Sequence, residues 1–401
     1  MTQTMDLYTD FLIANTGLAS VSKAGLALGI SKDKISRFLG GVTVFTKNRA
    51  PINVAYQTVQ TFEKKGLVSG HIKFNNQDLW GLVKKDVRAC EEAQGLVVGL
   101  GGVGGLGATL IIDDTIIEKE FTDENDIVCW HHDHCSGRSV KGINLLNGGL
   151  YYPGQDQYIP IFAELITKTI KYTDPKDNKE KRKSEVNKNE LFRNNFNCIM
   201  KNHIKLEITL FDIWYGSVEN LNFINGHRQK YICPLKSNRK LALSKNEKKS
   251  GKWYKLEEIT SQLDTQKTLE IWLEGSTHSN YLTKQVFENQ DGTIVTMYLI
   301  TNDQNLTKDQ IHNNYKRRWK VEEFHKSLKS NLGIESSPTK HQVSQNNHIF
   351  CSVIAYFKLE NLIKTPTARF KNHFQLKASL LVKALQTTYQ ELQLLKMGCE
   401  R

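Results

Sequence analysis

The segment from Ile311 to Leu332 constrains this chain most, because a helix through it has two faces of opposite character. At about 100° per residue, the apolar side chains of Val321, Phe324 and Leu328 fall on one side and can pack on a core. The other side carries a carboxylate among cations and aromatic rings: Tyr315, Arg318, Trp319, Glu322, Lys326 and Lys329. A solvated amphipathic helix with i,i+4 charge pairs has a similar face, so this segment alone leaves its role open.

Two apolar segments upstream are each followed by aspartate, as in buried strands that deliver an acid at their edge. Ala108–Ile112 precedes Asp113 and Asp114, and alternation along a strand lets only one of these two point into a common site. Ile204–Phe211 precedes Asp212, which is followed by aromatic residues and a glycine that opens a helix. A single strand-end aspartate is commonly a turn or cap residue. The order strand–Asp, strand–Asp, helix–Glu is more specific.

The spacing Tyr-x2-Arg-x3-Glu-x6-Lys, which begins at Tyr315 and ends at Lys329, resembles the signature of DDE-type bacterial insertion-sequence transposases. These are cut-and-paste enzymes with an RNase H-like catalytic core. The Asp-x-Trp-Tyr run at Asp212 resembles the second aspartate motif of that group, and the Asp-x-Thr context of Asp113 resembles the first. The three motifs stand in the expected order along the chain.

The resemblance implies a triad of catalytic, metal-binding carboxylates: Asp113, Asp212 and Glu322. Asp114 stays open as an alternative to Asp113. The residues implied to position DNA are Tyr315, Arg318 and Lys329, and Trp319 is a candidate to stack on an unpaired base.

Carboxylates suit phosphodiester cleavage because negative charge builds up on a centre that is already anionic. Three of them can hold two Mg²⁺ or Mn²⁺ ions about 3.5–4 Å apart, which activate the nucleophile and stabilise the leaving oxygen. By resemblance, water first releases the transposon 3′ end, and the 3′-OH then attacks the other strand or the target DNA. His325 needs no role as a base in this scheme and is predicted to be a surface histidine.

The charge balance favours a polyanionic partner, because 54 Lys and Arg against 42 Asp and Glu give a net charge of +12. We expect double-stranded DNA, both transposon ends and target, bound by a homodimer that brings two ends together. Seven scattered cysteines do not suggest a disulfide framework. No apolar run reaches the roughly 18–20 residues of a membrane span, and no secretory signal is visible. The expected location is the bacterial cytosol, at the nucleoid when bound to DNA.

Near the N-terminus, the run from Ser22 to Leu39 has the spacing of a helix-turn-helix unit. Gly29 permits the turn, and Ser31 can cap the second helix. Side chains expected to face inward are Ile35, Phe38 and Leu39, and those expected to face DNA are Lys32, Lys34, Ser36 and Arg37. An ordinary helical hairpin would have the same spacing.

Two other patterns suggest chemistry but are discounted. Overlapping G-x-G-x-x-G matches between Gly99 and Gly107 precede a strand and open no helix, which argues against a dinucleotide site. The run from Cys129 to Cys135 is too crowded to wrap one tetrahedral zinc ion and lacks a second spaced pair, so a polar loop is favoured.

The expected fold is mixed α/β: an RNase H-like core with a mostly β insertion, preceded by a helical helix-turn-helix-type domain. The predicted parts are a DNA-binding domain at 1–84, a core at 85–235 plus 304–365, an insertion at 236–303 and a helical segment at 366–401. Other predicted core elements are strands at 140–152, 158–166 and 230–235, a helix at 184–202, and helices at 345–363 and 374–397. Residues 176–188 are predicted to be an exposed loop.

Two functions from other classes remain as alternatives. The first is a catalytically inactive helix-turn-helix protein, either a decayed transposase or a repressor, against which the intact set of carboxylates argues. The second is a nucleotide-dependent oxidoreductase, which rests on the glycine run alone.

Overall fold

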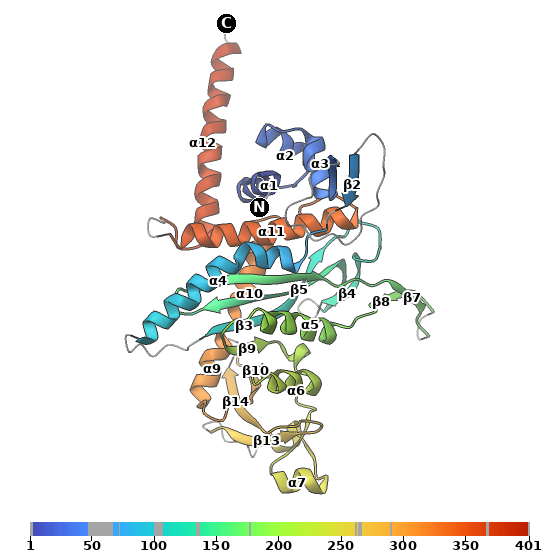
Figure 1. The fold of residues 1–401 in the computed structure, drawn as a ribbon, viewed down its shortest axis with the longest axis vertical. Coiled ribbons are helices and arrows are strands. Elements are labelled where there is room, and N and C mark those ends of the chain that lie inside the picture. Colours follow the sequence, from blue (N-terminus) through green and yellow to red (C-terminus); the bar gives the residue numbers. More distant parts are fainter. Residues whose placement is uncertain are drawn as a thin grey trace.

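The computed structural model describes residues 3–46, 67–71, 73–99, 107–133, 137–175, 178–260, 263, 267–288, 291–365 and 369–399. At its centre lies a large mixed sheet that spans the molecule (Figure 1). The core strands are β3 (Ala108–Glu118), β4 (Cys129–Asp133), β5 (Arg138–Tyr152), β6 (Gln157–Leu165), β9 (Leu206–Phe211) and β10 (Tyr231–Pro234). The strands predicted at 140–152, 158–166 and 230–235 are therefore confirmed.

The core strands lie in the order β6-β5-β3-β9-β10. β5 runs antiparallel to its neighbours β3 and β6, whereas β9 and β10 run parallel to β3. This mixed α/β sheet is compatible with the RNase H-like core expected from the sequence. One detail was wrong: β3 does not end at Ile112, because pairing with β5 continues through Asp113 and Asp114 as far as Glu118.

Helices cover both faces of this sheet. On one face lie α4 (Asn76–Gly99) and α5 (Lys188–Lys201), and on the other lie α10 (Trp319–Ser330) and α11 (Gln342–Ile363). The Tyr152 hydroxyl donates to the Val87 carbonyl of α4, whereas Tyr158 of the next strand packs its ring 5.3 Å from that of Phe324 on α10. Figure 1 shows α4 and α5 in front of the sheet and α10 behind it.

The predicted insertion extends the core sheet. Its elements are β11 (Lys240–Ala242), α7 (Lys245–Ser250), β12 (Tyr254–Lys255), α8 (Leu256–Ile259), β13 (Leu269–Leu273), β14 (Asn280–Glu288) and β15 (Ile294–Thr301). β15 pairs antiparallel with β10, so the strands between the second aspartate and the glutamate helix belong to the same sheet as the core. Between β9 and β10 lie a single 3-10 turn, η1 (Ile213–Tyr215), and α6 (Val218–Gly226).

The helix predicted from Ile311 to Leu332 is divided into α9 (Lys308–Lys316) and α10. At the junction, Arg317 N bonds to Asn314 O and Arg318 N bonds to Tyr315 O, so the backbone tightens into i→i−3 hydrogen bonds. The predicted inward face holds, because Val321, Phe324 and Leu328 are all buried. Burying each of these side chains contributes roughly 1.5–3 kcal/mol toward seating the helix on the sheet.

Of the N-terminal helices α1 (Gln3–Ala14), α2 (Val21–Leu28) and α3 (Lys32–Leu39), α1 and α3 pack against α11, and α2 packs against both of them (Figure 1). Tyr8 of α1 is fully buried, and its hydroxyl lies 3.0 Å from His348 Nδ1. Gly29 takes the left-handed conformation with φ 62°, which lets α2 end abruptly before α3 begins. The region also contains two strands that were not predicted, β1 (Val42–Thr46) and β2 (Leu67–His71), which pair antiparallel.

Two predicted segments differ in detail. The run at 176–188, expected to be a loop, contributes β8 (Glu180–Lys183), which pairs with β7 (Ile170–Thr173) in an exposed two-stranded ribbon. Residues 176–177 lie outside the described ranges. The helices predicted at 184–202, 345–363 and 374–397 are present as α5, α11 and α12 (His373–Cys399). α12 extends away from the rest of the molecule in Figure 1.

The discounted glycine run falls mostly outside the described residues, because 100–106 are not described. α4 ends at Gly99 and β3 begins at Ala108, so the order is helix then strand, opposite to that of a dinucleotide site. Cys129 and His131 lie on β4, whereas residues 134–136 are not described. None of the helices in the described ranges combines the length and apolar character needed to cross a bilayer.

Candidate active site

An arginine joins two of the three candidate carboxylates. Arg318 Nη1 lies 2.6 Å from Asp113 Oδ2, and Nη2 lies 3.2 Å from Glu322 Oε1. Asp113 stands in the middle of β3, whereas Arg318 and Glu322 belong to the start of α10. The fold therefore brings together residues that are about two hundred positions apart in the sequence.

Asp212 completes the group from the neighbouring strand. It follows Phe211, the last residue of β9, which pairs in register with Ile112, the residue before Asp113. Asp212 begins η1 without forming a side-chain cap. Among the described residues its carboxylate has neither a hydrogen bond nor an ion pair, so its oxygens are available to a ligand.

The electrostatics of Asp113 reflect this crowding. Burial raises the pKa of Asp113 to about 7. The Arg318 guanidinium opposes that rise, and the nearby carboxylates of Glu322 and Asp212 add to it. A buried set of acids that repel one another has a strong tendency to bind a cation.

Asp114 points to the opposite face of β3 and is held by neutral and cationic donors. It accepts from the Tyr215 hydroxyl at 2.6 Å, the Lys188 ammonium at 2.8 Å and the Asn144 amide at 2.9 Å. Burial raises the pKa of Asp114, but the Lys188 ion pair and these hydrogen bonds bring it below its usual range. Asp114 thereby ties η1, which follows Asp212, and α5 to β3, whereas Asp113 shares a side with Glu322.

No group of three or more His, Cys, Asp or Glu side chains is arranged to hold a metal ion within the part of the chain that the structure describes. At the candidate site, the Arg318 guanidinium lies between oxygens of Asp113 and Glu322. The donor set itself fits a hard divalent cation, since it consists of carboxylate oxygens with one unpartnered member, Asp212.

The other signature residues occupy different surroundings. The Arg318 guanidinium carbon lies 6.0 Å from the ring centroid of Tyr315, and burial raises the pKa of that phenol. Trp319 is 65% exposed and so is not a core tryptophan. Lys329 donates to the Ile116 carbonyl at 2.8 Å and lies 3.4 Å from Glu335 Oε1, so its ammonium is engaged at β3.

The prediction for His325 was wrong. Its side chain is buried on α10 and its Nε2 lies 2.9 Å from the Asn147 amide nitrogen. Counting from Val321, positions 321, 324, 325 and 328 follow the i, i+3, i+4, i+7 spacing of an inward face, and His325 occupies the i+4 place. Burial lowers the pKa of His325 to about 3, so it is a neutral packing residue.

Sequence reasoning missed three residues that shape the site. Arg317, beside Arg318, reaches Thr109 and Glu207 at 3.0 Å each and thereby anchors the junction of α9 and α10 to β3 and β9. Lys188 and Tyr215 hold Asp114. The one local signal in the sequence that could have pointed to Arg317 is its position next to Arg318 in the signature.

The candidate DNA-binding residues of α3 lie elsewhere. Lys32, Lys34, Ser36 and Arg37 are exposed, whereas Ile35 and Leu39 are buried and Phe38 is half-buried, as predicted. The Asn347 amide of α11 donates to the Leu39 carbonyl at 3.0 Å, so α3 sits on α11. The carboxylates are carried by β3, β9 and α10 instead, and α3 does not contribute to their site (Figure 1).

A comparison with known families finds one match. Residues 177–358 match the model of the transposase DDE domain. The matched region contains Asp212, Arg318 and Glu322 and begins after Asp113. No curated protein matches the chain. Residues 177–358 are therefore similar to a transposase DDE domain, which supports a DDE-type transposase.

Proposed function

We propose that this protein binds the terminal repeats of an insertion sequence, hydrolyses phosphodiester bonds there and joins the freed ends to target DNA. The observation that supports the proposal is that Arg318 joins Asp113 to Glu322, while Asp212 follows the strand that pairs in parallel with β3. DDE transposases are metal-dependent as a family, and these three carboxylates would hold two Mg²⁺ or Mn²⁺ ions. Such ions, when bound, generate a nucleophile at neutral pH and neutralise charge on the leaving oxygen.

Arg318 gives the site a way to respond to DNA. A guanidinium binds carboxylate and phosphate through the same paired N–H groups. Arg318 can therefore exchange its contacts to Asp113 and Glu322 for a DNA phosphate, which frees both carboxylates. Tyr315 lies against the guanidinium and orients it.

Other residues are proposed to hold the DNA around this centre. Trp319 is exposed at the start of α10, and we assign it to stack on an unpaired base. Lys329 is assigned to a terminal phosphate, for which it must leave the Ile116 carbonyl. On α3, the exposed side chains assigned to sequence-specific binding are Lys32, Lys34, Ser36 and Arg37. Such a protein would act on DNA in the bacterial cytosol.

A homodimer is proposed because two transposon ends must be brought together, and α12 offers a surface for it. Positions 374, 378, 381, 385, 388, 392 and 395 of this helix follow alternating spacings of four and three, and all of them except Thr388 are apolar. The exposed members of this heptad stripe are Phe374, Leu381, Leu385, Leu392 and Leu395. In a parallel coiled coil, Glu391 of one copy faces Lys396 of the other across the g–e′ pair, so a second copy of this chain complements the stripe in charge as well.

The test is strand cleavage of DNA that carries the element's own terminal repeats, with Mg²⁺ or Mn²⁺. The wild type is expected to nick at the repeat boundary only when metal is present. Glu322→Gln is expected to lose cleavage by at least about a thousandfold while it keeps DNA binding. Glu323→Gln is the matched control, because Glu323 is the next residue on α10 and pairs with Lys320 instead of Arg318.

Specific binding of the repeats by the wild type without any cleavage would replace this proposal with the alternative of an inactive DNA-binding protein. Equal loss of cleavage in both glutamate variants would remove Glu322 from the triad.

A further inference from the structure

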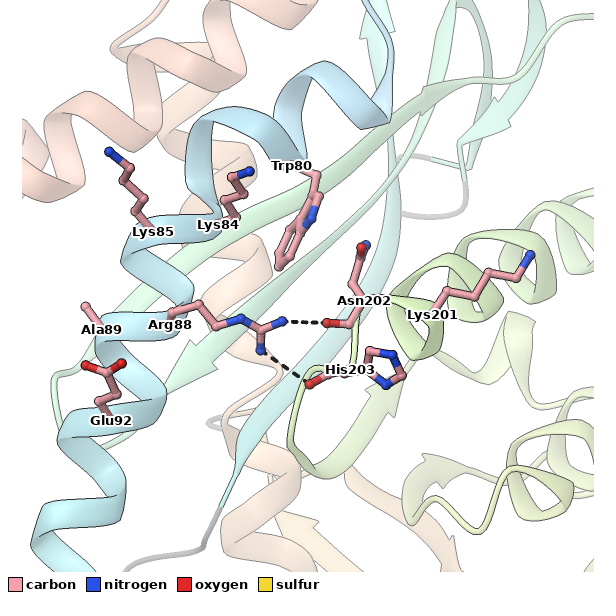
Figure 2. Close-up of a pocket in the computed structure, with 9 residues that line it drawn as sticks. All are labelled: Trp80, Lys84, Lys85, Arg88, Ala89, Glu92, Lys201, Asn202 and His203. Atoms are coloured by element: carbon pink, nitrogen blue, oxygen red, sulfur yellow. Dashed lines mark hydrogen bonds between the residues drawn. The ribbon is translucent and has the colours of Figure 1, made fainter.

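A basic pocket of about 540 Å³ lies between α4 and the C-terminal end of α5 (Figure 2). It lies on the face of the sheet opposite α10, because α4 and α5 both pack on the side of β3 that carries Asp114. It also lies at the opposite end of β9. Asn202 and His203 precede that strand and Asp212 follows it, which separates the pocket from the carboxylates by about 20 Å at ~3.3 Å per residue.

One wall of the pocket is a ridge along α4. Trp80, Lys84 and Arg88 recur at intervals of four and so line up on one side of the helix, with Lys85 beside them. Trp80 is half-buried, and the Arg88 guanidinium carbon lies 5.9 Å from its ring centroid. The indole and the guanidinium together line the inner side of the pocket.

Arg88 also closes the other wall. Its Nη2 donates to the Asn202 carbonyl at 2.6 Å and its Nη1 to the His203 carbonyl at 3.3 Å, as drawn in Figure 2. Glu91 fixes the same Nη1 at 2.6 Å. These contacts satisfy carbonyls at the end of α5, so the negative end of that helix does not repel an anion that enters the pocket.

The charge available to a ligand comes from three lysines at the rim. Lys84, Lys85 and Lys201 are exposed, and none of them has an ion pair among the described residues. Only one carboxylate, that of Glu92, lines the pocket. Several other cations near the sheet are neutralised, such as Lys188 by Asp114 and Arg182 by Asp126.

We propose that this basic pocket binds the phosphate backbone of a second DNA duplex, separate from the DNA that is cleaved at the carboxylates. The inference rests on the proposed function, which requires more than one duplex to be held at once. Three unpaired lysines at a solvent-facing rim suit successive backbone phosphates, which they contact without reading sequence. The duplex is either target DNA or the transposon end held by the partner copy, since both present the same backbone.

The first experiment measures the salt dependence of binding to a labelled duplex of arbitrary sequence. The variant Lys84→Ala/Lys85→Ala/Lys201→Ala is expected to reduce the slope of log K against log[salt] by about 2–3, near 0.9 per lost phosphate contact. The control Lys245→Ala/Lys249→Ala/Lys267→Ala removes the same charge from exposed lysines of the insertion. An equal change of slope in both triple variants would overturn the proposal.

The second experiment compares products from terminal-repeat DNA with and without a target duplex. A fall of about tenfold in strand transfer relative to hydrolysis identifies target DNA. If the pocket variant instead fails to form the paired-end complex in a gel, and strand transfer and hydrolysis fall together as a result, the bound duplex is the transposon end held by the partner copy. If hydrolysis at a single unpaired end falls as much as binding does, the pocket holds the cleaved DNA itself and the proposal is wrong.

Free nucleotide is tested with deoxyadenosine monophosphate and inorganic pyrophosphate. Saturable binding of either one that the pocket variant abolishes, with an unchanged DNA slope, would overturn the proposal in favour of a nucleotide pocket. The DNA titration does not depend on catalysis. If the wild type never cleaves, but the pocket variant shows the expected change in slope relative to it, the proposed function is rejected and this site is retained.

Discussion

Arg318 of α10 forms an ion pair with Asp113 of β3 at 2.6 Å while it contacts Glu322 of its own helix at 3.2 Å. This single guanidinium joins the sheet to the glutamate helix and neutralises two acids that would otherwise repel one another. The same contacts occupy carboxylate oxygens that a divalent ion would use. Arg318 therefore stabilises the free protein and would compete with a divalent ion for these two carboxylates.

Arg318→Gln should bind Mn²⁺ more tightly in the absence of DNA, by about tenfold, which corresponds to 1.4 kcal/mol. Glutamine keeps a polar contact but removes the positive charge that repels the ion. Calorimetric titration or electron paramagnetic resonance of free Mn²⁺ would measure the change. Weaker Mn²⁺ binding in this variant would show that Arg318 prepares the carboxylates for the metal rather than competing with it.

Substitutions of Asp113 and Asp114 should have different effects on stability and cleavage, because the two side chains face opposite sides of β3. Asp114→Asn breaks the Lys188 ion pair and weakens the Tyr215 contact, and should lower the free energy of unfolding by about 3 kcal/mol. Asp113→Asn removes a carboxylate whose burial is unfavourable, so it should lower the free energy of unfolding by less than half as much. The same variant should abolish cleavage. Urea denaturation and the cleavage assay together measure both effects.

The opposite result, in which Asp113→Asn unfolds the protein and Asp114→Asn only abolishes cleavage, would assign the triad to Asp114. A double variant with Lys188→Met reports the coupling. The decrease in unfolding free energy caused by Asp114→Asn should be smaller when Lys188 has already been replaced.

Acid should destabilise the protein through buried neutral histidines. Burial lowers the pKa of His348 to about 4, whereas an unfolded histidine titrates near 6.5. Between these two pKa values the imidazole is protonated only in the unfolded state. The free energy of unfolding therefore decreases as the pH falls from 6.5 toward 4. One such group accounts for about 2 kcal/mol at pH 5.

Urea midpoints at pH 7 and pH 5 test this directly. In His348→Gln the difference in unfolding free energy between the two pH values should be smaller than in the wild type by about 2 kcal/mol. His341→Gln is the matched control, because His341 is exposed at the start of α11. Equal pH dependence in the wild type and His348→Gln would mean that His348 is protonated in the folded state.

The position of Asp212 after a strand and that of Glu322 on a helix were readable from the sequence because local signals specify them. An apolar run followed by Asp212, and the spacing from Tyr315 to Lys329, need no tertiary information. The break between α9 and α10 was not readable, because it depends on Arg317 and Arg318 reaching back to β3 and β9. His325 was misplaced for a related reason, since a polar side chain was assumed to be exposed although its position lies on the inward face.

Longer-range features were out of reach. Extension of the core sheet by β11–β15 depends on the pairing of β15 with β10, which no pattern in either strand specifies. The basic pocket needs α4 and the end of α5 side by side, although their residues are more than a hundred positions apart. The heptad stripe of α12, in contrast, was present in the sequence and was overlooked.

Dimerisation through that stripe makes the sharpest prediction about assembly. Leu385 and Leu392 would lie at the centre of a parallel coiled coil, so Leu385→Glu/Leu392→Glu should give a monomer by light scattering after gel filtration. Glu391→Lys should weaken the dimer by placing it against Lys396 of the second copy, and adding Lys396→Glu should restore it. Gln390→Glu, on the outer side of the helix, should leave the mass unchanged. A dimer that survives loss of both leucines would place the interface elsewhere, and a double charge variant that stays monomeric would contradict the parallel arrangement.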